Sequence, residues 1–298
     1  MRTFWIFLGI GALVFSWGVL GQGMEIREVI LRDRERNREV EAILFLPQGE
    51  GPFPLIVLSP GFLLSGRNYQ KLGRHLAEQG FSVALLNFRY SIFSSDHRVL
   101  VQDLLFSIQG LLGLEKRLDH QKIGLLGHSL GGKISILAAS EDPRVKALAA
   151  LDPVDAGPPG QSPSERFPMA RDRLDKVQIP MLLIGAELGG KVRVGSPCAP
   201  EEANFERIWE KAQGPAWAIN QLGAGHMDYL DDPNCGLLCS VCVPGKNPDL
   251  SLSLVQSYLA LFFKAFLLEA PEFLEELEDL LRRHEEEGLI VVKRKGLN

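Results

Sequence analysis

The chain has 298 residues, a formal net charge of −5, 46% hydrophobic residues and 23% charged residues. These values are typical of a globular protein with one large domain or two small ones, and they exclude a disordered tail, a collagen and a polytopic membrane protein. The acidic balance argues against a nucleic-acid-binding protein, which usually carries a basic excess.

The first predicted element is a leader. Arg2 precedes an uncharged apolar run of 17 residues, 4–20, and the small residues that follow fit a cleavage site before Gln22. This order is typical of a secretory signal peptide over residues 1–21. An uncleaved N-terminal anchor is the alternative, since such a run nearly spans a bilayer. In both cases we expect the body of the protein outside the cytoplasm, either exported or tethered to a membrane.

Behind the leader, short apolar strands alternate with segments of helical length. The predicted strands cover residues 25–31, 40–46, 54–58, 81–86, 122–126, 145–151, 179–184 and 216–222. The predicted helices cover residues 68–79, 96–114, 130–139 and 249–268. Such alternation predicts an α/β fold, with a mostly parallel twisted sheet and helices on both faces. We expect one catalytic domain over residues 22–270. A charged C-terminal extension over 271–298 follows it, with an amphipathic helix and then a candidate edge strand at 289–292.

Two long segments interrupt this alternation. Residues 155–168 and 187–202 are rich in loop-forming residues and follow the strands that end at Leu151 and Ile184. The carboxyl ends of parallel strands lie at one edge of a sheet, and long loops there commonly shape a binding site. We expect both loops to border the functional site.

All four cysteines lie in the C-terminal third of the chain. They are Cys198, Cys235, Cys239 and Cys242. Outside the cytoplasm these residues predict disulfides. The favoured arrangement joins Cys198 to the 235–242 cluster and closes a small loop within that cluster. The Cys239-x-x-Cys242 spacing is also that of zinc ligands, so a zinc site is the alternative. No cofactor is predicted, and no metal outside that alternative.

The most informative stretch is Gly127-His128-Ser129-Leu130-Gly131, which matches the pattern G-x-S-x-G. A predicted strand precedes it and a predicted helix follows it, which is the context of a nucleophile elbow. The two glycines leave room where the strand and the helix pass closely. We therefore predict Ser129 as a catalytic nucleophile.

A serine nucleophile needs two N–H donors for the developing oxyanion. The first predicted donor is Leu130 N–H, directly after the nucleophile and at the start of a helix, where the partial positive charge favours an anion. The second is Phe62 N–H, in the turn 59–62 that follows the 54–58 strand.

His226 is the predicted general base. The expected order along the chain is serine, acid, histidine, and His226 lies in a loop after the last predicted strand of the domain. Its imidazole can accept the Ser129 proton and return it to the leaving group. The other five histidines do not combine this order with this location. They are His75, His97, His120, His128 and His284.

Asp152 is the predicted acid, because it ends the 145–151 strand and is therefore rigidly placed. A carboxylate is needed there to fix the tautomer of the histidine. Asp155 in the same loop and Glu187 after the next strand remain alternatives. Three more carboxylates are predicted to shape the histidine loop: Asp228, Asp231 and Asp232.

Several motifs together resemble the chlorophyllase family of α/β hydrolases. They are S-P-G-F at 59–62, G-H-S-L-G-G-K at 127–133, L-D-P-V-D at 151–155, P-C-A-P-E-E-A-N at 197–204 and G-H-M-D-Y-L-D-D at 225–232. The likeness spans about residues 40–268, and the last two motifs are the most specific. Platelet-activating-factor acetylhydrolases and dienelactone-hydrolase-like proteins are similar more loosely.

The resemblance implies an α/β-hydrolase fold and hydrolysis of an ester on a large hydrophobic molecule, without a metal or cofactor. The triad of the family falls on Ser129, Asp152 and His226. Leu130 departs from the arginine that usually follows the nucleophile in this family. The leader and the charged extension are departures too. These features suit an exported bacterial esterase and leave the ester itself open.

The prediction is therefore a serine carboxylic-ester hydrolase that acts through an acyl-enzyme. Apolar residues beside the site are expected to contact a hydrophobic small-molecule ester: Leu63, Met227 and Tyr229. A general exported short-chain esterase, lipase or polyester hydrolase is the alternative. A catalytically silent lipid- or pigment-binding protein is the second alternative, because a fold does not prove an activity.

Overall fold

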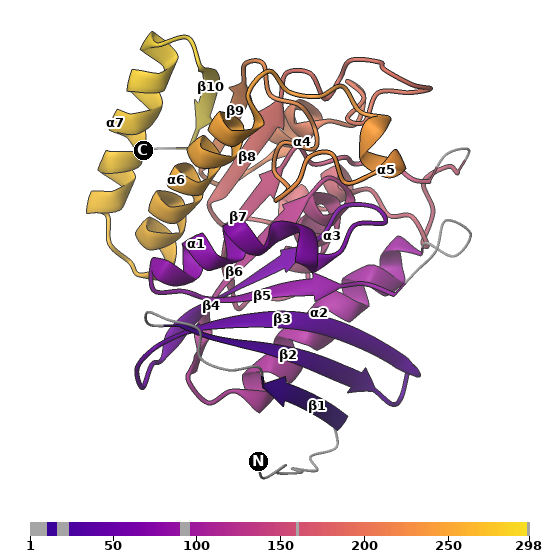
Figure 1. Ribbon diagram of the computed structural model, residues 1–298, viewed down its shortest axis with the longest axis vertical. Coiled ribbons are helices and arrows are strands. Elements are labelled where there is room, and N and C mark those ends of the chain that lie inside the picture. Colours follow the sequence, from indigo (N-terminus) through magenta and orange to yellow (C-terminus); the bar gives the residue numbers. More distant parts are fainter. Residues whose placement is uncertain (1–10, 17–23, 90–95, 159–160, 297–298) are drawn as a thin grey trace.

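The computed structural model describes residues 11–16, 24–89, 96–158 and 161–296. Within them one twisted sheet forms the centre of the molecule, with strand order β1-β2-β3-β5-β4-β6-β7-β8-β9-β10 (Figure 1). The strands are β1 (Gly11–Ser16), β2 (Met24–Asp33), β3 (Arg38–Pro47), β4 (Phe53–Ser59), β5 (Ser82–Asn87), β6 (Leu118–His128), β7 (Val145–Leu151), β8 (Met181–Ala186), β9 (Ala216–Gln221) and β10 (Ile290–Lys295).

The sheet is parallel from β5 through β4, β6, β7 and β8 to β9, and antiparallel at its two ends. The central strands are buried on both faces, as in β4, where Ile56 and Leu58 point to one core and Leu55 and Val57 to the other. Strands with helices on both faces need such continuous apolar runs. The predicted α/β class, with a mostly parallel sheet, is confirmed.

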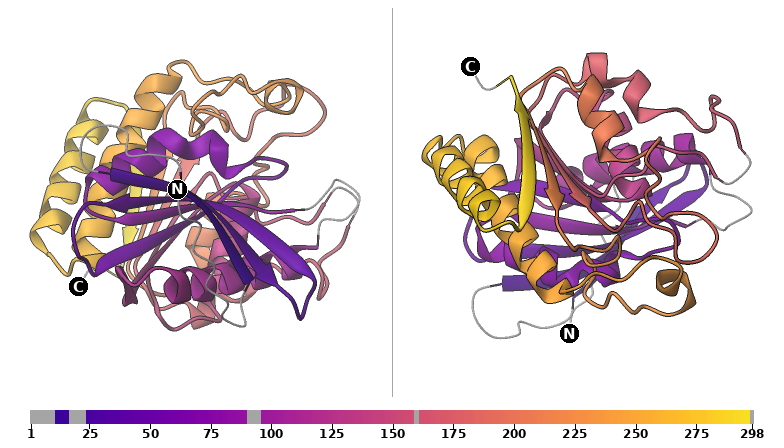
Figure 2. Two further views of the ribbon diagram at one scale, coloured as in Figure 1. Left: turned by 60° about the horizontal axis from the view of Figure 1, so that its bottom comes forward. Right: turned by 90° about the horizontal axis from the view of Figure 1, so that it is seen from above.

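Helices cover both faces of the sheet (Figure 2). One core lies beneath α1 (Gln70–Glu78), α6 (Pro248–Leu267) and α7 (Glu272–Glu286). The other lies beneath α2 (His97–Leu114), α3 (Leu130–Ala139) and α4 (Phe205–Lys211). The remaining helical segments are α5 (Leu237–Ser240) and the 3-10 turns η1 (Gly66–Tyr69), η2 (Ala170–Asp172) and η3 (Leu174–Lys176).

The two ends of the chain lie on the two edges of the sheet. Strand β10 pairs with β9, so the predicted edge strand exists and the charged segment 271–298 contributes to the main sheet. Residues 11–16 pair with β2 at the opposite edge. The rest of the predicted leader, residues 1–10 and 17–21, lies outside the described residues.

Several elements differ from the sequence prediction. Strand β1 and helix α5 were not predicted, β6 begins four residues before the predicted strand, and β8 and α4 differ for reasons that the sequence shows. Strand β8 begins at Met181, because Pro180 has no N–H to donate to a neighbouring strand. Helix α4 was not predicted. It begins after Asn204, whose side chain accepts the Glu206 N–H at 3.1 Å, and it buries Phe205 and Ile208 against the sheet.

Among the described residues, one helix is long and apolar enough to cross a membrane by length and composition. It is α6, and 61% of its most apolar window is buried inside the fold. This degree of burial is typical of a core helix.

Two disulfides lie in the loops at the carboxyl edge of the sheet. Cys198 pairs with Cys242, and Cys235 pairs with Cys239. This is the favoured arrangement, a cross-link to the cluster plus a small loop within it. All four cysteines are used, so none remains as a ligand for the alternative zinc site.

We expect the Cys198–Cys242 disulfide to stabilise the fold more than the Cys235–Cys239 disulfide does. The first spans 44 residues and the second only 4. By loop-closure entropy, replacing the first pair by alanines should lower the free energy of unfolding by about 4 kcal/mol, and replacing the second by about 2 kcal/mol. Urea unfolding of the two double variants measures both values. An equal or larger loss for the short-loop pair would contradict the expectation.

Candidate active site

Ser129 occupies a sharp turn between β6 and α3. Its backbone has φ +54° and ψ −122°, a conformation that is strained for a residue with a side chain. The glycines on either side make the turn possible. A Cβ on Gly127 would lie 2.2 Å from the Gly131 carbonyl oxygen, and one on Gly131 would lie 2.0 Å from the Ser59 carbonyl oxygen. The strand, turn and helix therefore have the geometry of a nucleophile elbow.

Three residues from distant parts of the chain form one hydrogen-bonded row. Ser129 Oγ lies 3.0 Å from His226 Nε2, and His226 Nδ1 lies 2.6 Å from Asp152 Oδ2. A carboxylate only accepts, so Nδ1 carries the proton and Nε2 is free to accept the serine proton. Ser129 exposes 9% of its surface, His226 3% and Asp152 1%. This arrangement can transfer a proton from the serine hydroxyl to the imidazole.

Asp152 is held in place by its backbone and by its second oxygen. It follows β7 with φ +38°, and its Oδ1 accepts the Ala186 N–H at 3.2 Å. The Gly189 backbone packs against the other oxygen so closely that a Cβ there would lie 2.2 Å from Oδ2. These contacts aim the carboxylate at His226.

The alternative acids have other partners. Asp155 accepts the N–H groups of Ala170 and Arg171 at 2.7 and 3.1 Å, and it lies 3.7 Å from the fully buried Lys133 ammonium. Burial lowers the pKa of Lys133 to about 8, and the Asp155 charge offsets part of that shift. Glu187 is exposed and accepts the Gly223 N–H at 2.6 Å. Neither carboxylate has a hydrogen bond to His226 among the described residues.

The three acidic residues near His226 in sequence bind backbone groups. Asp228 accepts the N–H groups of Gly225 and Gly245 and the Ser251 hydroxyl. Burial raises the pKa of Asp228, and these three hydrogen bonds act against that shift. Asp231 caps the start of α1, and Asp232 accepts the N–H of a residue in its own loop. These contacts shape the histidine loop.

The two predicted oxyanion donors lie on the segments beside Ser129. Leu130 is the first residue of α3, where backbone N–H groups have no partner within the helix. Phe62 lies in the turn after β4. A Cβ on the neighbouring Gly61 would lie 3.3 Å from Ser129 Cβ, so this turn contacts the elbow directly.

The predicted substrate contacts lie at different depths. Leu63 is 39% exposed on the turn after β4. Met227 is 9% exposed and lines a cavity of about 590 Å³. Tyr229 has no exposed surface, and its ring packs against His128 in the core.

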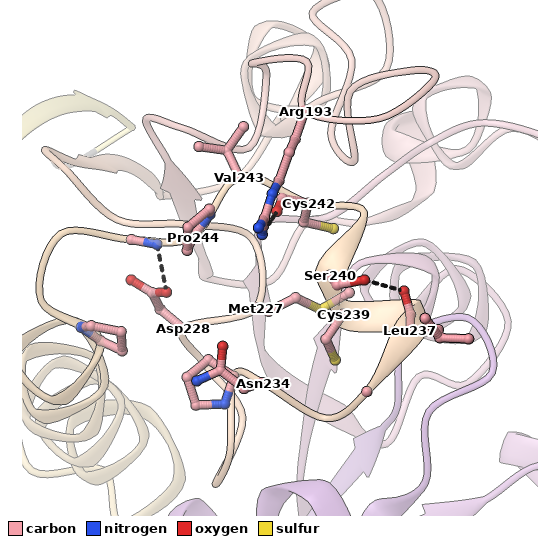
Figure 3. A pocket seen from close by; sticks show the side chains of 14 residues that line it. Arg193, Met227, Asp228, Asn234, Leu237, Cys239, Ser240, Cys242, Val243 and Pro244 are labelled. Carbon is pink, nitrogen blue, oxygen red and sulfur yellow. Dashed lines mark hydrogen bonds between the residues drawn. The ribbon is translucent and has the colours of Figure 1, made fainter.

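The cavity lined by Met227 lies between the disulfide-linked loops (Figure 3). Arg193, from the loop after β8, extends into it and donates to the Cys242 carbonyl oxygen at 3.3 Å. Leu237, the first residue of α5, stands on its wall with 90% of its surface exposed. The volume is in the range of small-molecule sites. The three residues of the hydrogen-bonded row do not line this cavity, but Met227, which does, directly follows His226 in the chain.

The sequence analysis did not identify Tyr69, His128 and Lys133 as parts of this region. All three are polar and have no exposed surface. Two features of the sequence could have indicated them: a lysine within an apolar helical run and a histidine at the end of an apolar strand. Polar residues in such buried positions need specific hydrogen-bond partners, so they mark a polar cluster inside the fold. In the part of the chain that the structure describes, no group of three or more potential metal ligands occurs.

Comparisons with known proteins give one family model and several relatives. The family model described as chlorophyllase matches residues 14–284. Chlorophyllase-2 of Arabidopsis thaliana is 29% identical over 248 residues, which are 76% of this chain and 77% of that protein. Chlorophyllase-1, chloroplastic, of Citrus sinensis is 31% identical over 198 residues, 64% of this chain and 59% of that protein. A bis(hydroxyethyl) terephthalate hydrolase of Streptomyces coelicolor is 32% identical over 107 residues, 35% of this chain and 34% of that protein.

Proposed function

Because this chain belongs to the chlorophyllase family, we propose that Ser129, His226 and Asp152 are its catalytic residues and that they cleave a hydrophobic ester. The general class of reaction follows from the family and the esterase relatives: the chain is a carboxylic ester hydrolase that acts on a small-molecule ester. The observation that supports the triad most directly is the row of hydrogen bonds of 3.0 and 2.6 Å through His226.

The proposed reaction has two halves. His226 Nε2 takes the hydroxyl proton as Ser129 Oγ attacks the ester carbonyl, and the resulting imidazolium is stabilised by the Asp152 carboxylate. The imidazolium then protonates the alcohol oxygen, the bond between that oxygen and the carbonyl carbon breaks, and an acyl-enzyme remains on Ser129. A water molecule repeats the sequence and releases the carboxylic acid.

Two backbone groups are proposed to stabilise the tetrahedral intermediate. Leu130 N–H and Phe62 N–H donate to its oxyanion, and the dipole of α3 adds a favourable field at the same point. Since both donors belong to the main chain, their positions depend on the elbow and on the turn after β4 and not on side-chain identity.

A hydrophobic ester fits the surroundings of His226. The adjoining cavity presents apolar side chains from the disulfide-linked loops, among them Met227, Leu237 and Val243. Leu130, directly after the nucleophile, is apolar and 6% exposed. Two named relatives are chlorophyllases, and we include chlorophyll among the candidate substrates for that reason.

Export is proposed from two features. The two disulfides favour an oxidising compartment. Residues 1–21 have the order of a secretory signal, and cleavage before Gln22 would remove β1 and leave β2 at the edge of the sheet. Fractionation of the producing cells, with mass spectrometry of the mature N-terminus, tests this: full-length protein in the cytoplasm would contradict it.

The function is tested by hydrolysis assays on the purified protein. p-Nitrophenyl esters of increasing acyl length are compared with chlorophyll, and the Ser129→Ala variant is the control. Cleavage of the simple esters alone identifies a general esterase, and release of the free acid of chlorophyll extends the activity named for the relatives to this chain. A wild type no faster than Ser129→Ala on every ester would favour the silent binding protein.

We expect Leu237→Ser to reduce activity on long esters selectively. Truncating this exposed apolar wall removes contact area for a long chain and leaves the triad untouched. The ratio of kcat/KM for a dodecanoate to that for a butyrate ester should fall about fivefold, roughly 1 kcal/mol of lost contact. Leu222→Ser is a matched control, since Leu222 is 40% exposed and lines a different pocket beside α6. An equal fall in both variants would contradict a role of this cavity in chain binding.

A further inference from the structure

His128 lies at the centre of a buried polar chain that the proposed reaction does not use. Its Nδ1 is 2.8 Å from the Tyr69 hydroxyl oxygen, and its Nε2 is 2.9 Å from the His226 backbone carbonyl oxygen. The Gly61 N–H donates to the same Tyr69 hydroxyl at 3.1 Å. Neither His128 nor Tyr69 has any exposed surface.

The His226 carbonyl and the buried, neutral His128 ring fix the direction of the bonds in this chain. The carbonyl can only accept, so His128 Nε2 carries a proton. A neutral imidazole carries one N–H only, so Nδ1 accepts from the Tyr69 hydroxyl, whose oxygen in turn accepts the Gly61 N–H. All of these bonds are satisfied when His128 is neutral with its proton on Nε2.

Three parts of the proposed site are thereby connected. Gly61 directly precedes Phe62 in the turn 59–62, which we call the oxyanion turn. His128 directly precedes Ser129, and the carbonyl at the far end of the chain of bonds belongs to His226. The ring centroids of His128 and His226 are 4.8 Å apart, so a charge on His128 would oppose the imidazolium that forms during turnover. Burial lowers the pKa of His128 well below its ordinary value, and the neighbouring His226 lowers it further.

We infer that Tyr69 and His128 are positioning residues for the triad and the oxyanion turn. This chain of hydrogen bonds runs from the Gly61 N–H through the Tyr69 hydroxyl and the His128 ring to the His226 carbonyl. It fixes the positions of the oxyanion turn and of the loop that carries His226 relative to Ser129. This inference rests on the proposed function for its kinetic consequence, but the hydrogen-bond chain itself can be tested without any activity.

Removing one hydroxyl gives the first test. Tyr69→Phe should lower kcat for p-nitrophenyl butyrate about tenfold to a hundredfold, the range for small misplacements of reacting groups, with KM changed less than about twofold. Tyr258→Phe is the matched control. Tyr258 is also fully buried and its hydroxyl oxygen also lies close to a histidine ring, 2.6 Å from His284 Nδ1, but this pair joins α6 to α7 outside the proposed site. Its kcat should stay within about twofold of the wild type. Equal kcat values for Tyr69→Phe and the wild type would overturn the inference.

A double-mutant cycle tests whether the two residues act as one chain. His128→Asn keeps an acceptor near the Nδ1 position but is too short to reach the His226 carbonyl, so it should also lower kcat. Added to Tyr69→Phe, the same change should cost at least about threefold less than it does in the wild type. Additive losses would mean two independent structural effects and would contradict a connected chain.

The tautomer of His128 is the readout that needs no catalysis. In ¹⁵N-labelled protein, side-chain spectra should show His128 neutral with its proton on Nε2 from pH 5.5 to 8.5. A protonated ring or the Nδ1–H tautomer would overturn the inference. If Tyr69→Phe does not fold, as judged by thermal unfolding, the kcat of His128→Asn and this spectrum decide the question. A wild type without esterase activity, by contrast, would refute the proposed function while the spectrum still tests the chain.

Discussion

Replacing Ser129 by alanine should reduce kcat for p-nitrophenyl butyrate by about a millionfold, the loss seen when the nucleophile of a serine triad is removed. The variant cannot form the acyl-enzyme, because the elbow then carries no nucleophilic side chain. The KM value should change little, since the ester's binding contacts are left intact. Steady-state kinetics on protein free of contaminating esterases measures both values.

A second serine on the same helix provides the matched control. Ser135 is buried in α3 and its hydroxyl donates to the Leu126 carbonyl oxygen at 3.3 Å, so Ser135→Ala removes a hydroxyl from the same helix without touching the triad. Its kcat should stay within about twofold of the wild type. Mass spectrometry after fluorophosphonate treatment should find one adduct on Ser129 in the wild type and none in Ser129→Ala. Labelling that survives this substitution would place the nucleophile elsewhere.

The parts of this protein that sequence could predict are those specified locally. The elbow depends on a run of neighbours, with glycines at 127 and 131 around Ser129, and the structure has the strand, turn and helix that the pattern indicates. Continuous apolar runs marked the central strands for the same reason, because each buries both of its faces. The shift of β8 and the missed α4 reflect a proline and an asparagine cap, which act on one or two residues only.

The parts that sequence could not predict depend on contacts between distant segments. Tyr69 is the last residue of η1, directly before α1, and reaches His128 at the end of β6, which is 59 positions away in the chain. Its neighbours in sequence, with Leu72 and Leu76 in the core, indicated only an amphipathic helix. The cavity beside Met227 lies between two loops that the Cys198–Cys242 disulfide joins. The sequence of either loop alone does not predict a cavity between them.

The choice among acids shows the same limit. Asp152 and Asp155 lie in one loop, and their spacing alone does not decide which one faces the histidine. The difference arises from the backbone of Asp152 at φ +38° and from the partners of Asp155, the N–H groups of η2 and the Lys133 ammonium. A resemblance to a family favoured Asp152, and the 2.6 Å contact with His226 agrees with that choice.

Asp152→Asn should lower kcat about ten-thousandfold at neutral pH with little change in KM. An asparagine amide can donate to His226 Nδ1, which stabilises the tautomer whose proton is on Nε2. In that tautomer Nε2 cannot accept the proton of the Ser129 hydroxyl 3.0 Å away, so the nucleophile is not activated. Steady-state kinetics from pH 6 to 9 measures the loss, and thermal unfolding shows whether the variant is folded.

Variants of the two alternative acids, Glu187 and Asp155, test whether the loss of kcat is specific to Asp152. Glu187→Gln is nearly isosteric and keeps an acceptor for the Gly223 N–H, so its kcat should stay within about twofold of the wild type. Asp155→Asn leaves Lys133 without its buried counter-charge, and that change should reduce the free energy of unfolding while the folded protein keeps most of its kcat. A loss of kcat in Glu187→Gln or folded Asp155→Asn as large as in Asp152→Asn would transfer the role of the acid. A loss confined to Asp152→Asn ties catalysis to the one carboxylate that orients His226.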